Sequence, residues 1–176
     1  EGFRLRVGGE TTANLSPNFF TKGYMAFGFR DKKIKYGLDL EYSFYDKSYH
    51  AREYPVNSLA VNLTSDIKTL GEEPVGSPSD NWAYSIKRMA IYNMLYYKQL
   101  KLQYMYEDMS GFSVNPWIKT EYQIPTDSIR FQPVSSDKPL DHLLNNEVGI
   151  KLRYAPKEKF VQGRIYRFNL KNPHPV

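Results

Sequence analysis

Apolar and polar residues alternate along this chain with a period of two, most regularly over residues 33–44. The segment reads KIKYGLDLEYSF, and every second residue is apolar or aromatic: Ile34, Tyr36, Leu38, Leu40, Tyr42 and Phe44. Successive side chains of a β-strand point to opposite faces, whereas a helix would spread these six residues around its circumference. The pattern therefore predicts a long amphipathic β-strand with one apolar face.

The same alternation recurs along the chain and predicts further strands, around 3–7, 19–30, 58–64, 82–87, 100–107, 112–124 and 147–154. Tight turns are expected near 14–18, 31–32, 93 and 108–111, and longer connections at 46–55, 68–80 and 125–143. Pro116 interrupts one strand, which suggests a bulge or an edge. One short helical turn is expected at 141–144, and the basic tail 155–176 shows no obvious closing strand.

Strand length bears on whether the apolar face meets a protein core or lipid. Strands of globular sandwiches usually have about 5–6 residues, whereas a tilted transmembrane strand needs about 9–11. With the residues that flank these alternating segments included, the strands expected here are about 9–13 residues long, which favours a membrane barrel. We therefore predict an all-β fold over residues 1–176: an antiparallel up-and-down transmembrane β-barrel with about eight strands here, forming part of a larger barrel.

Composition agrees with this class and excludes several others. Tyr 15 and Phe 10 are high counts, and aromatic residues favour strands and membrane interfaces. The candidate interfacial residues stand in pairs: Tyr42 and Phe44, Tyr96 and Tyr97, and Tyr104 and Tyr106. A net charge of +5 is dispersed rather than clustered, which argues against a nucleic-acid partner. Without cysteine the chain has no disulfide framework, thiol nucleophile or zinc–thiolate site.

Charged residues in the polar phase of the strands would line the interior of such a barrel. The candidates for binding are Arg4, Arg6, Lys35, Asp39, Glu41, Lys151 and Arg153, and Lys33, Lys87, Lys101, Glu107 and Glu147 share this phase. Opposite charges can pair across neighbouring strands, which would give a charge-laced, plugged lumen. The alternative is a basic-leaning pathway for an anionic solute, a lipid or a polypeptide. Sequence leaves both open.

Catalytic and metal-binding patterns are weak. The segment HAREY, with His50, Arg52 and Glu53, is either a loop ion pair or an extracellular or lumenal binding site. His142 follows Asp141 with Ser135 and Ser136 nearby, but the chain has no nucleophile elbow G-x-S-x-G. The acidic loop containing Glu72, Glu73 and Asp80 is better explained by solvation than by calcium. We therefore expect no enzymatic activity, no metal and no cofactor.

Three segments of the chain, 1–44, 50–55 (HAREYP) and 150–168 (IKLRYAPKEKFVQGRIYRF), resemble a Bacteroidota outer-membrane family in their order. Members of that family join an N-terminal carboxypeptidase-regulatory-like domain to a C-terminal β-barrel of uncharacterised function, distantly similar to bacterial surface antigen barrels. The resemblance implies a bacterial outer-membrane location, a signal peptide upstream and a barrel larger than this chain. It implies no known activity.

Three functions remain open at this stage. The first is a non-enzymatic outer-membrane barrel segment with a role in transport or envelope biogenesis, whose partners are outer-membrane lipid and either envelope proteins or missing strands of the same chain. The second is a soluble extracytoplasmic β-sheet that acts as a binding module. The third and weakest is an outer-membrane barrel hydrolase. An open sheet in lipid would expose unpaired edges, so we expect further strands to continue it.

Overall fold

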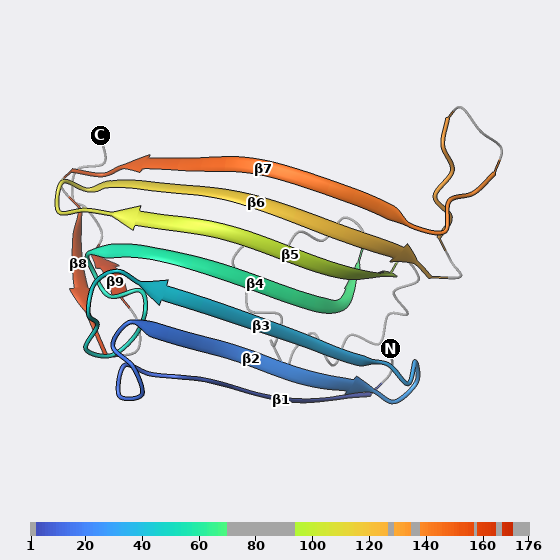
Figure 1. The fold of residues 1–176 in the computed structure, drawn as a ribbon, viewed down its shortest axis with the longest axis horizontal. Helices are drawn as coiled ribbons and strands as arrows, with labels where there is room; N and C mark the ends of the chain where they lie inside the picture. Colours follow the sequence, from blue (N-terminus) through green and yellow to red (C-terminus); the bar gives the residue numbers. More distant parts are fainter. Residues whose placement is uncertain are drawn as a thin grey trace.

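The computed structural model describes residues 3–69, 94–126, 129–134, 138–156, 158–164 and 167–170. Seven strands form one antiparallel sheet in sequence order (Figure 1). These are β1 (Arg4–Glu10), β2 (Phe19–Gly28), β3 (Ile34–Ser43), β4 (Val56–Thr69), β5 (Met94–Glu107), β6 (Phe112–Pro125) and β7 (Leu143–Tyr154). A short hairpin of β8 (Lys159–Gln162) and β9 (Arg167–Leu170) forms a second sheet. Among the described residues, no helix is long and apolar enough to cross a membrane.

The expected all-β, up-and-down architecture is confirmed, and β3 fills nearly all of the stretch 33–44 from which it was predicted. The sheet is open, because within the described ranges β1 and β7 each pair with one neighbour only. The expected strand at 82–87, with Lys87, and the acidic loop residues Glu72, Glu73 and Asp80 lie outside the described residues.

Two local predictions are wrong. Pro116 lies in β6 between β5 and β7, so it marks neither an edge nor a shift of register. The ladder with β5 omits Pro116 and Asn115 and resumes in the same register, because a proline has no N–H to donate. Residues 141–144 contain no helical turn, since β7 begins at Leu143. The tail was expected to contain no closing strand, and in the part of the chain that the structure describes its short strands β8 and β9 pair only with each other, in a sheet separate from the seven-stranded one.

Successive strands are displaced in one direction across the sheet. One row of paired residues crosses all seven strands from Gly8 to Asn145. Gly8 is the fifth residue of β1, whereas Asn145 is only the third residue of β7. Most of β7 therefore extends beyond the end of β1. A barrel closes only when its strands are tilted and staggered in this way, so the register is compatible with part of a barrel wall.

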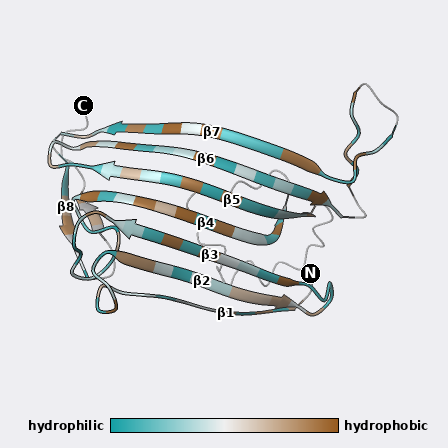
Figure 2. Ribbon diagram, in the orientation of Figure 1, coloured by the Kyte–Doolittle hydropathy of each residue, from teal (hydrophilic) through white to brown (hydrophobic). Residues whose placement is uncertain are grey.

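The two faces of the sheet differ completely in charge. Every charged residue of the seven strands except Lys98 lies in one phase: Arg4, Arg6, Glu10, Lys22, Lys35, Asp39, Glu41, Asp66, Lys68, Lys101, Glu107, Lys119, Glu121, Glu147, Lys151 and Arg153. The other phase is apolar, and hydrophilic and hydrophobic bands accordingly alternate along the strands in Figure 2. We call these the polar face and the apolar face.

Two aromatic residues on the polar face lie flat over glycines of the neighbouring strand. Tyr24 is paired with Gly37, and Trp117 is paired with Gly149. A Cβ atom added to either glycine would collide with the ring. Cross-strand covering of a glycine by an aromatic ring stabilises strand register, so both pairs fix neighbouring strands on the inside of the curve.

Gly149→Ala is expected to lower the free energy of unfolding by about 1–3 kcal/mol, because the indole of Trp117 must leave its place over β7. Denaturant titration followed by circular dichroism measures the change. The Trp117→Leu background has no indole to displace. Adding Gly149→Ala there should therefore lower the free energy of unfolding much less than it does in the wild type. If Gly149→Ala costs as much on the Trp117→Leu background, the ring is not the cause.

Candidate functional site

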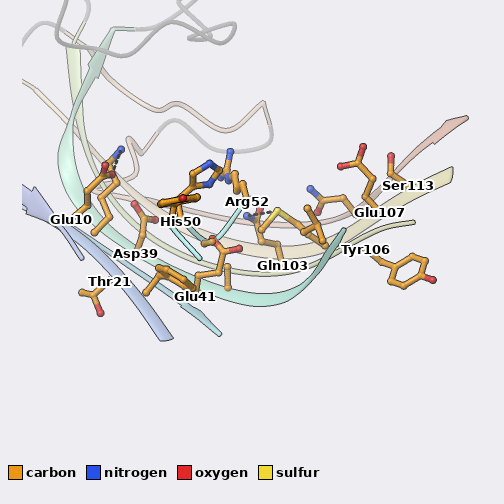
Figure 3. A pocket seen from close by; sticks show the side chains of 18 of the residues that line it. Glu10, Thr21, Asp39, Glu41, His50, Arg52, Gln103, Tyr106, Glu107 and Ser113 are labelled. Carbon is orange, nitrogen blue, oxygen red and sulfur yellow. Dashed lines mark hydrogen bonds and ion pairs between the residues drawn. The ribbon is translucent and has the colours of Figure 1, made fainter. Parts of the chain in front are cut away.

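The polar face is hollowed at the end of the sheet where β3 stops and β4 begins (Figure 3). The hollow has a volume of about 840 Å³, within the range of small-molecule sites. Its floor is formed by the strands, which supply Glu10, Lys22, Asp39, Glu41, Gln103, Glu107, Asn115, Lys151 and Arg153. Its rim is formed by the connection between β3 and β4, which supplies residues 49–52, and by Arg164 of the β8–β9 turn.

The connection between β3 and β4 is held in shape by its own buried charges. The ammonium of Lys47 donates hydrogen bonds to the carbonyls of Glu53 at 2.5 Å and Pro55 at 2.6 Å. The Glu53 carboxylate accepts from the backbone amides of Ser48 at 2.8 Å and His50 at 3.1 Å. Burial lowers the pKa of Lys47, outweighing the attraction of Glu53 and Glu41. This internal clamp is what presents His50 and Arg52 to the hollow.

The β8–β9 hairpin lies against this connection at the same end of the sheet (Figure 1). The Phe160 ring packs edge-on against Tyr54 with centroids 4.8 Å apart, and the Arg164 guanidinium lies 5.6 Å from the Tyr49 ring centroid. Arg153 of β7 is paired with Glu158 at 2.5 Å just before the hairpin. The end of the hollow is therefore flanked by two elements that contact each other.

The opposite end of the polar face is filled by a network of paired side chains. Arg4 donates two hydrogen bonds to Asp66, at 3.1 and 2.8 Å, although the two residues lie 62 positions apart. The Tyr24 hydroxyl donates to the same carboxylate at 2.6 Å, and Arg6 stacks over the Tyr24 ring at 3.7 Å. Lys68 pairs with Glu121 nearby. These charges stabilise the wall and leave little room for a ligand.

Lys35 belongs to a separate, buried pair at the turn between β2 and β3. Its ammonium donates to Asp31 at 2.7 Å, and the hydroxyl of Tyr96 donates to the same carboxylate oxygen at 3.0 Å. Lys35 is 1% exposed. Burial alone would raise the pKa of Asp31, but the hydrogen bonds from Lys35 and Tyr96 outweigh it and lower the pKa.

Acid is expected to weaken the wild-type chain more than the Asp31→Asn variant. Because the folded pKa of Asp31 is lowered, its contribution to stability is present above an unfolded pKa of about 3.9 and is lost as pH falls through the folded pKa. The wild-type free energy of unfolding should therefore drop below pH ~4 by about 1–3 kcal/mol more than that of the variant. Parallel curves for the two proteins would contradict the role given to Asp31.

The structure divides the charges that sequence grouped together. Asp39, Glu41, Lys151 and Arg153 line the hollow, as do the loop residues His50 and Arg52. Arg4, Arg6 and Lys35 are committed to the contacts described above, and Glu53 is a buried loop clamp rather than a rim ligand. The sequence pattern predicts neither Tyr49 of the loop nor Arg164 of the tail, since nothing in the alternation links those segments to the interior of the sheet. Gln103 shares the polar phase of β5 with Lys101 and Glu107, but it carries no charge and is not among the predicted binding residues.

The structure describes only part of the Ser-His-Asp arrangement that could be drawn from Ser135 or Ser136, His142 and Asp141. The His142 ring stacks on Tyr122 with centroids 4.9 Å apart, and Tyr122 belongs to the apolar phase of β6. His142 does not line the hollow. Ser135 and Ser136 lie outside the described residues.

Comparison with known proteins adds no functional assignment. No protein-family model matches the chain, and no curated protein or solved structure matches it.

Proposed function

We propose that this chain is a non-enzymatic segment of a β-barrel of the bacterial outer membrane, with its apolar face against lipid and its polar face toward the lumen. The lumen would bind or pass a solute, and a role in envelope biogenesis belongs to the same proposal. The resemblance to the Bacteroidota barrel family stays a prediction, and the proposal does not depend on it.

The observation that carries the proposal is the segregation of charge. All strand charges but Lys98 lie on the hollowed face. A charged side chain on the lipid side of a barrel costs about 2–4 kcal/mol near the bilayer centre, so lipid selects for such segregation. The apolar face bears large exposed side chains, including Phe3 at 72%, Leu152 at 62% and Val148 at 84% exposure.

The apolar face is also graded along the strands. From β3 to β7 one row of paired residues forms an aliphatic belt: Leu40, Val61, Leu102, Ile118 and Val148. On β2 the row continues at Thr21. Another row, nearer the hollow end, contains Phe19, Tyr42 and Tyr104, and Phe44 packs on Tyr42 at 5.3 Å. Phe3, Phe27 and Phe29 pack together at the other end. An aliphatic belt between two aromatic groups is the pattern of a membrane-spanning barrel.

The open edges of β1 and β7 require partners in lipid, where unpaired backbone groups cost several kcal/mol each. In a seven-stranded meander the first and last strands run in the same direction, so these two strands could pair with each other only in parallel. Closure by antiparallel pairing throughout requires an odd number of additional strands. We therefore expect further strands of the same protein to complete the wall.

Detergent dependence and gel migration test the proposal. The chain should need detergent or lipid to remain monodisperse, and it should run faster on a gel before boiling than after boiling. A chain that is monodisperse in plain buffer and unfolds cooperatively there would instead be a soluble binding module, and the proposal would be abandoned. The hydrolase alternative requires that the wild type hydrolyse lipid or peptide and that His142→Ala lose this activity.

A further inference from the structure

Four charged side chains that form no ion pair with a described residue gather in the hollow. Within the described residues, Asp39 accepts a hydrogen bond only from the Asn62 amide at 2.5 Å, and Glu41 only from the Ser58 hydroxyl at 2.7 Å. Neither carboxylate is paired with a cation there. Arg52 and Lys151 likewise make no ion pair or hydrogen bond with any described residue. All four side chains line the same cavity.

Outside the hollow, carboxylates of the polar face are paired with cations. The carboxylates of Asp66, Glu121 and Asp31 each receive a cation within hydrogen-bond distance. The polar face can therefore neutralise its own charges where it is filled.

Among the residues of the hollow, Lys22 pairs with Glu10 at 3.7 Å and Arg153 pairs with Glu158. Asp39, Glu41, Arg52 and Lys151 stay outside any ion pair with a described residue, which is costly for a wall but suited to a ligand.

Lys151 is separated from the carboxylates along the wall, whereas Arg52 belongs to the rim above them. Asp39 and Glu41 project from β3, whereas Lys151 lies on β7, four strands away, and Arg52 lies on the rim. Figure 3 shows His50 and Arg52 above the strands that carry the carboxylates. Neighbouring strands are about 4.8 Å apart, so β3 and β7 are separated by roughly 19 Å along the curved wall. This separation is between the backbones. The side chains of Glu41 and Lys151 both line the cavity and shorten the gap that an extended peptide, at about 3.5 Å per residue, has to span.

We propose that the hollow binds a small zwitterionic solute, a short peptide with free termini, whose ammonium faces Asp39 and Glu41 and whose carboxylate faces Arg52 and Lys151. The guanidinium of Arg52 can hold a carboxylate by two parallel hydrogen bonds. The volume of about 840 Å³ accommodates a peptide of a few residues. This inference deepens the proposed function by naming the class of solute, and it rests on that function for its place in a lumen.

Calorimetric titration of the full chain with triglycine, N-acetyl-triglycine and triglycine amide tests the proposal, in detergent or in whichever medium keeps the chain monodisperse. Each capped peptide lacks one terminal charge and should bind at least tenfold more weakly than triglycine. Arg52→Gln should weaken triglycine by about tenfold and leave triglycine amide unchanged. Asp39→Asn/Glu41→Gln should weaken triglycine similarly and leave N-acetyl-triglycine unchanged.

Lys98→Gln is the matched control, because Lys98 is the strand charge on the apolar face and should not affect binding. Near-ultraviolet circular dichroism of each variant shows that the fold is kept. Equal binding of all three peptides, or no binding of triglycine, would overturn the proposal, and tighter binding of N-acetyl-triglycine would replace it by an anion site. None of these binding results changes the expected need for detergent. Failure of the peptide-binding proposal can therefore be told apart from failure of the proposed membrane barrel.

Discussion

Leu38→Arg is expected to block assembly of the chain into lipid vesicles. Leu38 belongs to the apolar phase of β3, where its register partners are Gly23 and Leu63. A guanidinium placed there would face lipid, at a cost of about 2–4 kcal/mol near the bilayer centre. The measurement is the fraction of protein that becomes resistant to added protease and migrates in the folded, unboiled position.

Asp39→Arg is the control for this prediction, since it adds the same side chain one residue further along β3 but on the polar face. It should assemble like the wild type, as should the milder Asp39→Asn. Equal assembly of Leu38→Arg and Asp39→Arg would mean that the apolar face does not meet lipid. Equal failure of both would mean that the strand tolerates no added bulk at either position.

Asp66→Ala is expected to cause the largest loss of stability, about 2–4 kcal/mol in the free energy of unfolding. Asp66 accepts two hydrogen bonds from Arg4, one from the Tyr24 hydroxyl and one from the Ile67 amide. Removing the carboxylate takes the paired charge away from a guanidinium that is largely buried, with 26% of its side chain exposed. Urea titration of the detergent-folded chain measures the loss.

Tyr24→Phe separates the parts of this network. It removes one hydroxyl and keeps the ring that covers Gly37 and carries Arg6. A loss of about 1 kcal/mol is expected, because one hydrogen bond to a charged group is removed while Arg4 stays paired. A loss as large as that of Asp66→Ala would show that the hydroxyl, rather than the ion pair, holds β1 to β4.

Alternation alone was sufficient to predict the sheet. β3 was predicted almost to the residue, because six apolar side chains in one phase leave no helical alternative. The same rule assigned Arg4, Asp39 and Lys151 to one face, since a strand has only two faces. Proline was misinterpreted at Pro116 because the ladder on the β5 side could be interrupted without a shift of register.

Alternation could not predict which charges remain available to a ligand. Arg4 pairs with Asp66 across two intervening strands, and Lys35 pairs with Asp31 across a turn. Both pairings depend on the register and curvature of the sheet, which the alternation of apolar and polar residues does not encode. The rim depends on the buried Lys47 clamp and on a hairpin of four-residue strands. Neither leaves a periodic signal, and for this reason Arg164 was missed.

The central claim is that one face of this sheet meets lipid, and spin-label accessibility along β3 tests it most directly. Single cysteines at positions 34–43 of this cysteine-free chain, labelled after reconstitution into vesicles, report contact with lipid-soluble oxygen and with a water-soluble nickel complex. Our account predicts that oxygen contact peaks at the even positions, Ile34 to Tyr42, and nickel contact at the odd positions, with a period of two. High nickel contact at Leu38 and Leu40, or no periodicity, would contradict it.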